Sequence, residues 1–72
     1  MPNSDETPLQ LAQRHVAEGQ ERVSRQETLI AKLIRDEHDH MLPNANALLD
    51  QLRGFVAFSE AHMERLIAEG AA

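Results

Sequence analysis

The densest group of residues able to do chemistry lies in the stretch RDEHDH, from Arg35 to His40. Imidazole and carboxylate groups are ligands of zinc and the usual groups of acid–base catalysis. Asp36 and His40 are four residues apart and share a face of an intact helix, whereas His38 points elsewhere. A helical two-histidine site needs histidines at i and i+4, and the sequence has no such pair. A metal site on Asp36, His38 and His40 is therefore only the weaker alternative.

The same stretch is typical of the polar end of a helix, because histidines near a helix C-terminus interact favourably with the helix dipole. His15 and His62 lie far from this stretch in the sequence and are expected at the opposite end of the fold. The sequence contains no cysteine, and Ser59 has His62 three residues later without a third orienting group. We therefore predict no catalytic residue, no cofactor and no physiological metal site, so the protein is not expected to be an enzyme.

The elements that position these residues begin after a polar lead-in, residues 1–7, which is expected to be disordered. Thr7 can cap a helix, and Pro8 suits its first position because proline lacks the N–H that would be unsatisfied there. Residues then recur at alternating spacings of three and four, which predicts one long helix over about residues 8–40. The recurring residues are Leu9, Ala12, Val16, Gly19, Val23, Gln26, Ile30 and Leu33.

Pro43 disfavours helical geometry at the preceding residue, so a turn is expected over about residues 41–44. A second helix is predicted over about residues 44–69, opened by Pro43 or capped by Asn44 and ending before Gly70. The predicted fold is an all-α antiparallel two-helix hairpin occupying residues 8–72. The residues expected to form its core or a dimer face are Leu9, Val16, Val23, Ile30, Leu33, Leu49, Leu52, Val56, Met63 and Leu66.

If the chain reversed direction at residue 42 or 43, the residues facing each other across the two helices would have numbers that sum to about 85. Gln26 would then face Ser59, with His62 close by. This arrangement predicts a buried polar layer that sets the register of the helices; a binding pocket lined by these three residues and a looser, solvated contact remain alternatives.

The same fold would place Gly19 opposite Leu66. A glycine inside a helix costs about 1 kcal/mol relative to alanine, so it indicates either a close approach of another helix or a tolerated exposed position.

Composition limits the classes of protein that this chain can belong to. Seventy-two residues without cysteine form one small domain, whose core rarely supplies more than about 3–5 kcal/mol. Association with a second copy into a homodimeric four-helix bundle is therefore expected, since the apolar stripe of the second helix is wider than one neighbour can cover. A net charge of −5 and only two aromatic residues argue against nucleic-acid binding. No apolar run is long enough to cross a membrane, and a cytoplasmic location is expected.

Several motifs of the chain resemble a group of short bacterial proteins known from alphaproteobacteria. The pattern of that group resembles RHIxEG, then RQxxLIxxL, then GHD, then LLxxF and a later HxxH. The matching residues are Arg14-His15-Val16, Glu18-Gly19, Arg25-Gln26, Leu29-Ile30, Leu33, His38-Asp39, Leu48-Leu49, Leu52 and His62. Glu37 stands where the group has a glycine, and Ser59 stands where it has a histidine. The resemblance covers about residues 12–66 and implies a helical hairpin without implying an activity.

These features together predict a small non-enzymatic module of the cytoplasm that acts through a helical surface. Its expected partner is a second copy of itself, with another protein as a further possibility and neither nucleic acid nor membrane. The alternative is a helical bundle that binds a metal or a small ligand through histidines and carboxylates.

Overall fold

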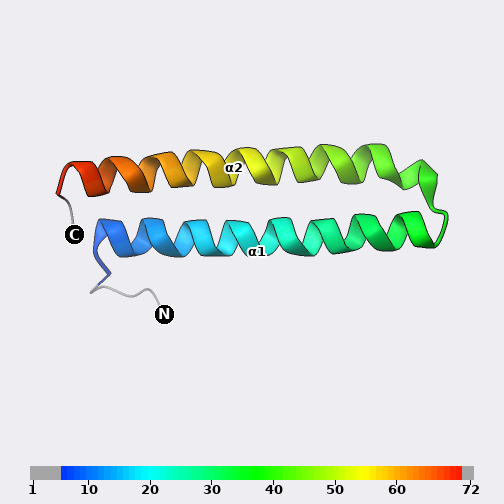
Figure 1. Cartoon of the computed structure of the whole chain (residues 1–72), viewed down its shortest axis with the longest axis horizontal. Helices are drawn as coiled ribbons and strands as arrows, with labels where there is room; N and C mark the ends of the chain where they lie inside the picture. Colours follow the sequence, from blue (N-terminus) through cyan, green and yellow to red (C-terminus); the bar gives the residue numbers. More distant parts are fainter. Residues whose placement is uncertain (1–5, 71–72) are drawn as a thin grey trace.

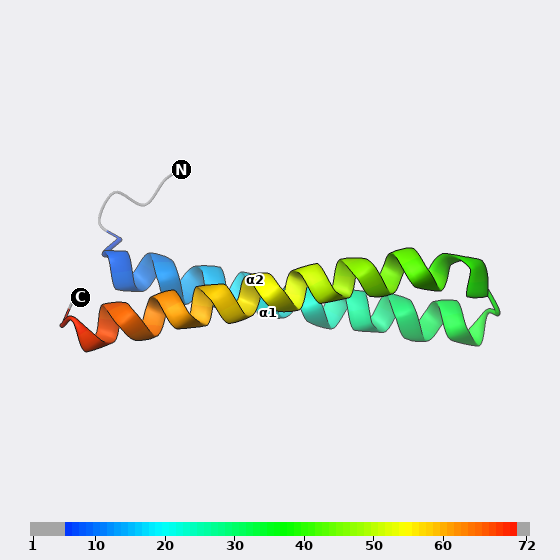
Figure 2. The same cartoon turned by 90° about the horizontal axis from the view of Figure 1, so that it is seen from above.

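The computed structural model describes residues 6–70, in which two antiparallel helices pack side by side (Figure 1). Helix α1 spans Pro8–Arg35, a short 3-10 helix η1 spans Asp39–Met41, and α2 spans Leu42–Ala68. The described part of the chain contains no β-strand. The second view shows the helices crossing at a shallow angle, with the start of α1 beside the end of α2 (Figure 2). The predicted all-α hairpin is confirmed.

Helix α1 begins with the predicted cap. The Gln10 backbone N–H donates to Thr7 Oγ1 at 3.1 Å, and the Thr7 N–H donates to Gln10 Oε1 at 2.9 Å. This reciprocal pair is a capping box, which satisfies two backbone donors that the first turn leaves unpaired. Pro8 occupies the first turn as expected.

The residues before the helix were predicted to be disordered up to residue 7. Residues 1–5 lie outside the described part of the chain, but Glu6 and Thr7 are held in place, so the prediction is wrong for these two. The Arg14 guanidinium donates to both carboxylate oxygens of Glu6 at 3.0 Å. Hydrogen bonding to Arg14 also lowers the pKa of the Glu6 carboxyl. Because the pKa is lowered, the contact is present at neutral pH and is lost as the pH falls through that pKa.

Helix α1 ends at Arg35, five residues earlier than the sequence predicted. The Glu37 N–H donates to the Ile34 carbonyl at 3.2 Å, and the His38 N–H donates to the Leu33 carbonyl at 2.9 Å. These two bonds form a Schellman motif, the usual helix stop that places the next residue in the left-handed region. Glu37 takes that conformation, with φ of 58°. The helix therefore ends at this position even though Glu37, and not the usual glycine, takes the left-handed conformation.

The turn consequently lies at residues 36–38, and the predicted turn at 41–44 is wrong. Pro43 instead occupies the first turn of α2, where a missing N–H has no cost, and Asn44 is inside the helix rather than its cap. The end of α2 agrees with the sequence: Gly70 follows it with φ of 73°, and its N–H donates to the Ile67 carbonyl at 3.0 Å.

The earlier turn changes the register of the two helices. A Cβ atom added to Gly19 would lie 2.8 Å from Val56 Cγ2 and 3.4 Å from Phe55 Cδ1, so the expected close approach is present but its partner is not Leu66. Facing residues have numbers that sum to about 75, as 19 and 56 do, rather than 85. The predicted pairings of Gly19 with Leu66 and of Gln26 with Ser59 are therefore wrong.

The two core stripes keep the spacing that the sequence showed. All ten residues predicted for the core or a dimer face are buried or half-buried in the hairpin. The stripe of α2 also includes Leu42, Ala45 and Ser59, which continue the alternating spacing of three and four. The hydrophobic residues that are buried within residues 6–70 are few and mostly small: Ala12, Val16, Leu33, Ala45 and Leu49.

The close approach at Gly19 predicts opposite effects at two helical glycines. Gly19→Leu should lower the free energy of unfolding by about 1–3 kcal/mol, because the new side chain overpacks the contact with Val56. Gly54 is the matched control, since a Cβ there meets nothing within 4 Å. Gly54→Ala should therefore raise the free energy of unfolding by about 1 kcal/mol through helix propensity. Urea unfolding measures both; equal stability of Gly19→Leu and wild type would contradict a tight contact.

The positive φ of Glu37 predicts a stabilising substitution in the turn. Glu37→Gly should raise the free energy of unfolding by about 1 kcal/mol, because glycine enters the left-handed region without the steric cost that other residues bear. Glu37→Ala is the control, since alanine has the same Cβ and removes the charge without removing the strain. Thermal unfolding should rank the glycine variant above both alanine and wild type. A gain of the same size in both variants would assign the effect to charge.

Candidate interaction surface

The three residues predicted to form a polar layer do not come together. Gln26 and Ser59 are both buried, each 7% exposed, whereas His62 is exposed. Gln26 Nε2 donates to the Ala45 carbonyl at 2.9 Å. Ser59 lies 14 residues beyond Ala45 in the same helix, a separation of roughly 21 Å. Gln26 thus reaches a main-chain oxygen of α2 without help from Ser59 or His62, and the three residues do not line a shared pocket within one hairpin.

The histidines of the turn are solvent-exposed. The His38 and His40 rings lie edge to face with centroids 6.1 Å apart, and Asp36 caps the end of α1 beside Arg35, with 3.7 Å between the charged groups. Within residues 6–70, no three side chains of His, Cys, Asp or Glu gather closely enough to hold a metal ion. The stretch from Arg35 to His40 forms a helix end and a turn, with two neighbouring imidazoles.

The turn histidines can be tested directly. The double change His38→Gln, His40→Gln should leave the helix content and the oligomeric state unchanged, because both side chains are exposed and neither contributes to the core. Untagged wild-type protein should carry no stoichiometric metal by elemental analysis. Zinc, iron or copper at one per chain or per dimer, lost in the double variant, would establish the metal-binding alternative.

The two long sides of the hairpin differ in chemistry. Met41, Leu48 and Phe55 recur every seven residues and form a row along one edge of the core stripe of α2. Leu29 of α1 lies beside this row, because it shares a shallow groove with Met41 and Leu48. We define the apolar side as the following exposed residues: Leu11, Leu29, Met41, Leu48, Phe55 and Phe58.

Helix geometry assigns Leu11 and Phe58 to this side. Leu11 precedes Leu29 by 18 residues, which is five turns, so the two side chains leave α1 in the same direction. Phe58 follows Phe55 by three residues and neighbours it on the surface of α2. Phe55 is 44% exposed and Phe58 is 68% exposed. Six of the eight large exposed hydrophobic residues of the described chain are therefore on one side of the hairpin.

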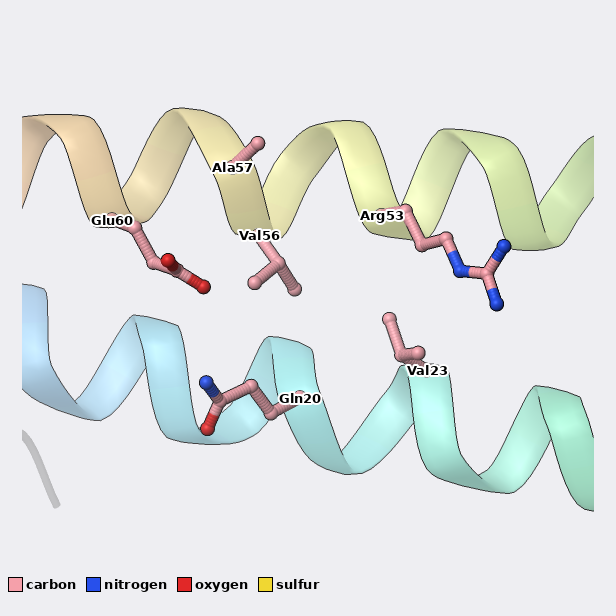
Figure 3. Close-up of a pocket in the computed structure, with 6 residues that line it drawn as sticks. All are labelled: Gln20, Val23, Arg53, Val56, Ala57 and Glu60. Carbon is pink, nitrogen blue, oxygen red and sulfur yellow. The ribbon is translucent and has the colours of Figure 1, made fainter.

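The opposite side carries charges and a small hollow (Figure 3). Val23 and Val56 point into the gap between the helices, and Gln20, Arg53 and Glu60 surround them. Arg53 also bridges the two helices, with Nη2 3.0 Å from Glu27 Oε2. We call this the polar side. Its large exposed hydrophobic residues are Ile34 and Ile67, on different helices and separated along the hairpin.

Comparison with known proteins adds no assignment: no family model, no curated protein and no solved structure matches the chain. Across residues 6–70, neither helix has a segment long and apolar enough to cross a membrane. The surface itself is consequently the source of any functional inference.

Sequence reasoning found only part of this surface. The excess apolar width of α2 is predictable from Leu48 and Phe55, whereas Phe58 lies off the stripe of three- and four-residue spacing and is not indicated by it. Leu29 and Met41 were missed because the predicted turn at 41–44 placed Met41 in the turn and shifted α1 against α2. The recurrence of Met41, Leu48 and Phe55 at intervals of seven residues was the available sequence signal for this surface.

Proposed function

We propose that the chain is a small non-enzymatic interaction module that associates with a second copy through its apolar side, forming a homodimeric four-helix bundle. The observation that carries the proposal is the concentration of six large exposed hydrophobic residues on one side of the hairpin. Each phenylalanine offers about 150–250 Å², so Phe55 and Phe58 alone expose on the order of 200 Å². Adding the three leucines and the methionine gives a patch of the size that marks an interaction site on small soluble proteins.

The weak core of a single hairpin supports the same proposal. Two of the five buried hydrophobic residues are alanines, and no large side chain in residues 6–70 is fully enclosed. A small domain of this kind usually needs a disulfide, a metal or a partner, and the sequence has no cysteine. Covering the apolar side with a second hairpin would complete a core between four helices. A stable dimer buries about 800 Å² per partner, roughly one-seventh of the 5441 Å² surface of the chain.

A cytoplasmic location is part of the proposal, supported by the complete absence of cysteine from the sequence. The alternative function, metal or small-ligand binding at Asp36, His38 and His40, would rest on two imidazoles and a carboxylate at an exposed turn. The elemental analysis described above distinguishes the two functions.

Association through the apolar side predicts a sharp difference between two lysine substitutions. Sedimentation equilibrium of the wild type at micromolar concentration should give twice the chain mass of 8.1 kDa. Leu48→Lys should raise the dimer dissociation constant on the order of 100-fold, because each dimer would bury two charged groups in an apolar contact. Ile34→Lys is the matched control, since Ile34 is more exposed than Leu48 but lies on the polar side.

Far-UV circular dichroism of both variants establishes that the helices persist. A wild-type monomer at all concentrations would contradict self-association. Equal weakening by Leu48→Lys and Ile34→Lys would remove the apolar side as the contact surface.

A further inference from the structure

The two helices contribute differently charged edges to the apolar side. From Met41 to His62, the positions of α2 that face this side carry no formal charge. Those positions are Met41, Asn44, Leu48, Gln51, Phe55, Phe58 and His62. The corresponding positions of α1 include three bases, Arg22, Arg25 and Lys32. The one acid among them before the turn is Glu18, which is paired with Arg14 at 3.2 Å. Arg25 is paired with Glu21 of its own helix. The apolar side thus has a basic row on α1 beside an α2 row that is uncharged and aromatic from Met41 to His62 and reaches a charge only at Arg65, near the end of the helix.

The register fixes which members of the two rows lie at one level along the hairpin. Core residues with numbers that sum to about 75 face each other, as Gly19 and Val56 do. In the rows at the edge of the core, this places Leu29 level with Leu48, Arg22 level with Phe55, and His15 level with His62. Leu29 and Leu48 line one groove, in agreement with this alignment. The level of Leu29 and Leu48 is therefore near the turn, and the level of His15 and His62, called the histidine level, is near the other end.

Two copies related by a twofold axis can meet face to face in two ways. With the turns at opposite ends, α1 packs on α1 of the partner and α2 packs on α2. With the turns at the same end, α1 packs on α2 of the partner. Neighbouring helices are antiparallel in both arrangements, so helix dipoles do not distinguish them. The side chains of the two rows do distinguish them.

Turns at opposite ends would lay one basic row against the other, with Arg22 facing the partner's Arg22. Like charges directly opposed across an interface disfavour that arrangement. This arrangement would also bring the level of Leu29 and Leu48 against the partner's histidine level. Turns at the same end lay the basic row against the uncharged row. Arg22 then reaches the partner's Phe55, a cation–π contact, and Leu29 meets the partner's Leu48.

Resting on the dimer proposed above, we propose that the two hairpins associate with their turns at the same end, so that α1 of each copy packs on α2 of the other. Residues of α1 then lie opposite the same residues of the partner's α2 that they are level with inside their own hairpin. Leu29 and Leu48 of the two copies then form a four-leucine layer. His15 and His62 of each copy lie beside His15 and His62 of the partner, near the chain ends.

The natural absence of cysteine makes orientation measurable, because a single introduced cysteine takes a spin label at one defined position. His38→Cys places the label in the exposed turn, away from the contact surface. Pulsed electron paramagnetic resonance on the intact dimer should give an interchain distance below about 25 Å. Turns at opposite ends would separate the labels by about 40 Å, the length of a 27-residue helix.

Gly54→Cys is the matched control, because it is exposed, lies near the middle of α2, and gives an intermediate distance in either orientation. An intermediate Gly54 distance with a long His38 distance would overturn the proposed orientation while leaving the dimer intact. Absence of any interchain distance at Gly54, with a monomer by sedimentation, would instead overturn the dimer itself.

Disulfide formation between two singly substituted chains tests the helix pairing separately. Arg25 and Gln51 lie at nearly the same level on the outer edges of the two rows. Mixing Arg25→Cys with Gln51→Cys should give mainly the mixed disulfide, since α1 lies on the partner's α2. Oxidation of either variant alone should give at least tenfold less crosslinked dimer. Predominant Arg25→Cys or Gln51→Cys self-crosslinking would show that like helices pack together and would overturn the proposal.

Discussion

Two backbone hydrogen bonds at the end of α1 determine the pairing of every residue in the hairpin. The bonds from Glu37 and His38 to the Ile34 and Leu33 carbonyls stop the helix at Arg35. If the helix ended five residues later, facing residues would have numbers that sum to about 85 rather than 75. Each residue of α1 would then face a residue of α2 about ten positions further along. Gly19 would then lose its position beneath Val56 and Phe55, and Gln26 would lose the Ala45 carbonyl. The contents of the core and the composition of both sides depend on this one turn.

The turn was also what the sequence could not place. Heptad spacing depends only on the side chains along each helix, so it predicted both helices and ten positions that are buried or half-buried in the hairpin. Register depends on where the chain reverses, and the local signals there were misleading. Pro43 suggested a break but is equally suited to a first helical turn, and Glu37 occupies a conformation usually reserved for glycine. The strain at Glu37 is tolerated because the packed stripes on both helices agree with that register.

The candidate surface was likewise predictable where it depends on spacing along one helix, and unpredictable where it depends on the register of the two helices. The excess of apolar residues on α2 was predictable from composition and spacing, whereas the side on which they gather depended on the register. The polar residues that the sequence singled out occupy structural positions in the hairpin. His38, His40 and Asp36 proved to be turn and cap residues, and Gln26, Ser59 and His62 lie at different levels or exposures. Polar residues near a helix end are required by unpaired backbone groups, so their presence there does not by itself indicate a site.

The glycine in α1 connects the inside of the hairpin to its apolar side. Because Gly19 has no side chain, the ring of Phe55 can lie near the α1 backbone while its outer part remains at the surface. A larger residue at that position would push Phe55 outward or displace α2, and either movement would change the contour of the apolar side. Arg22 is level with this ring and provides a charge that distinguishes the α1 edge from the α2 edge, which is uncharged from Met41 to His62. The packing that stabilises one hairpin therefore also shapes the apolar side, which is the surface proposed to contact a second copy.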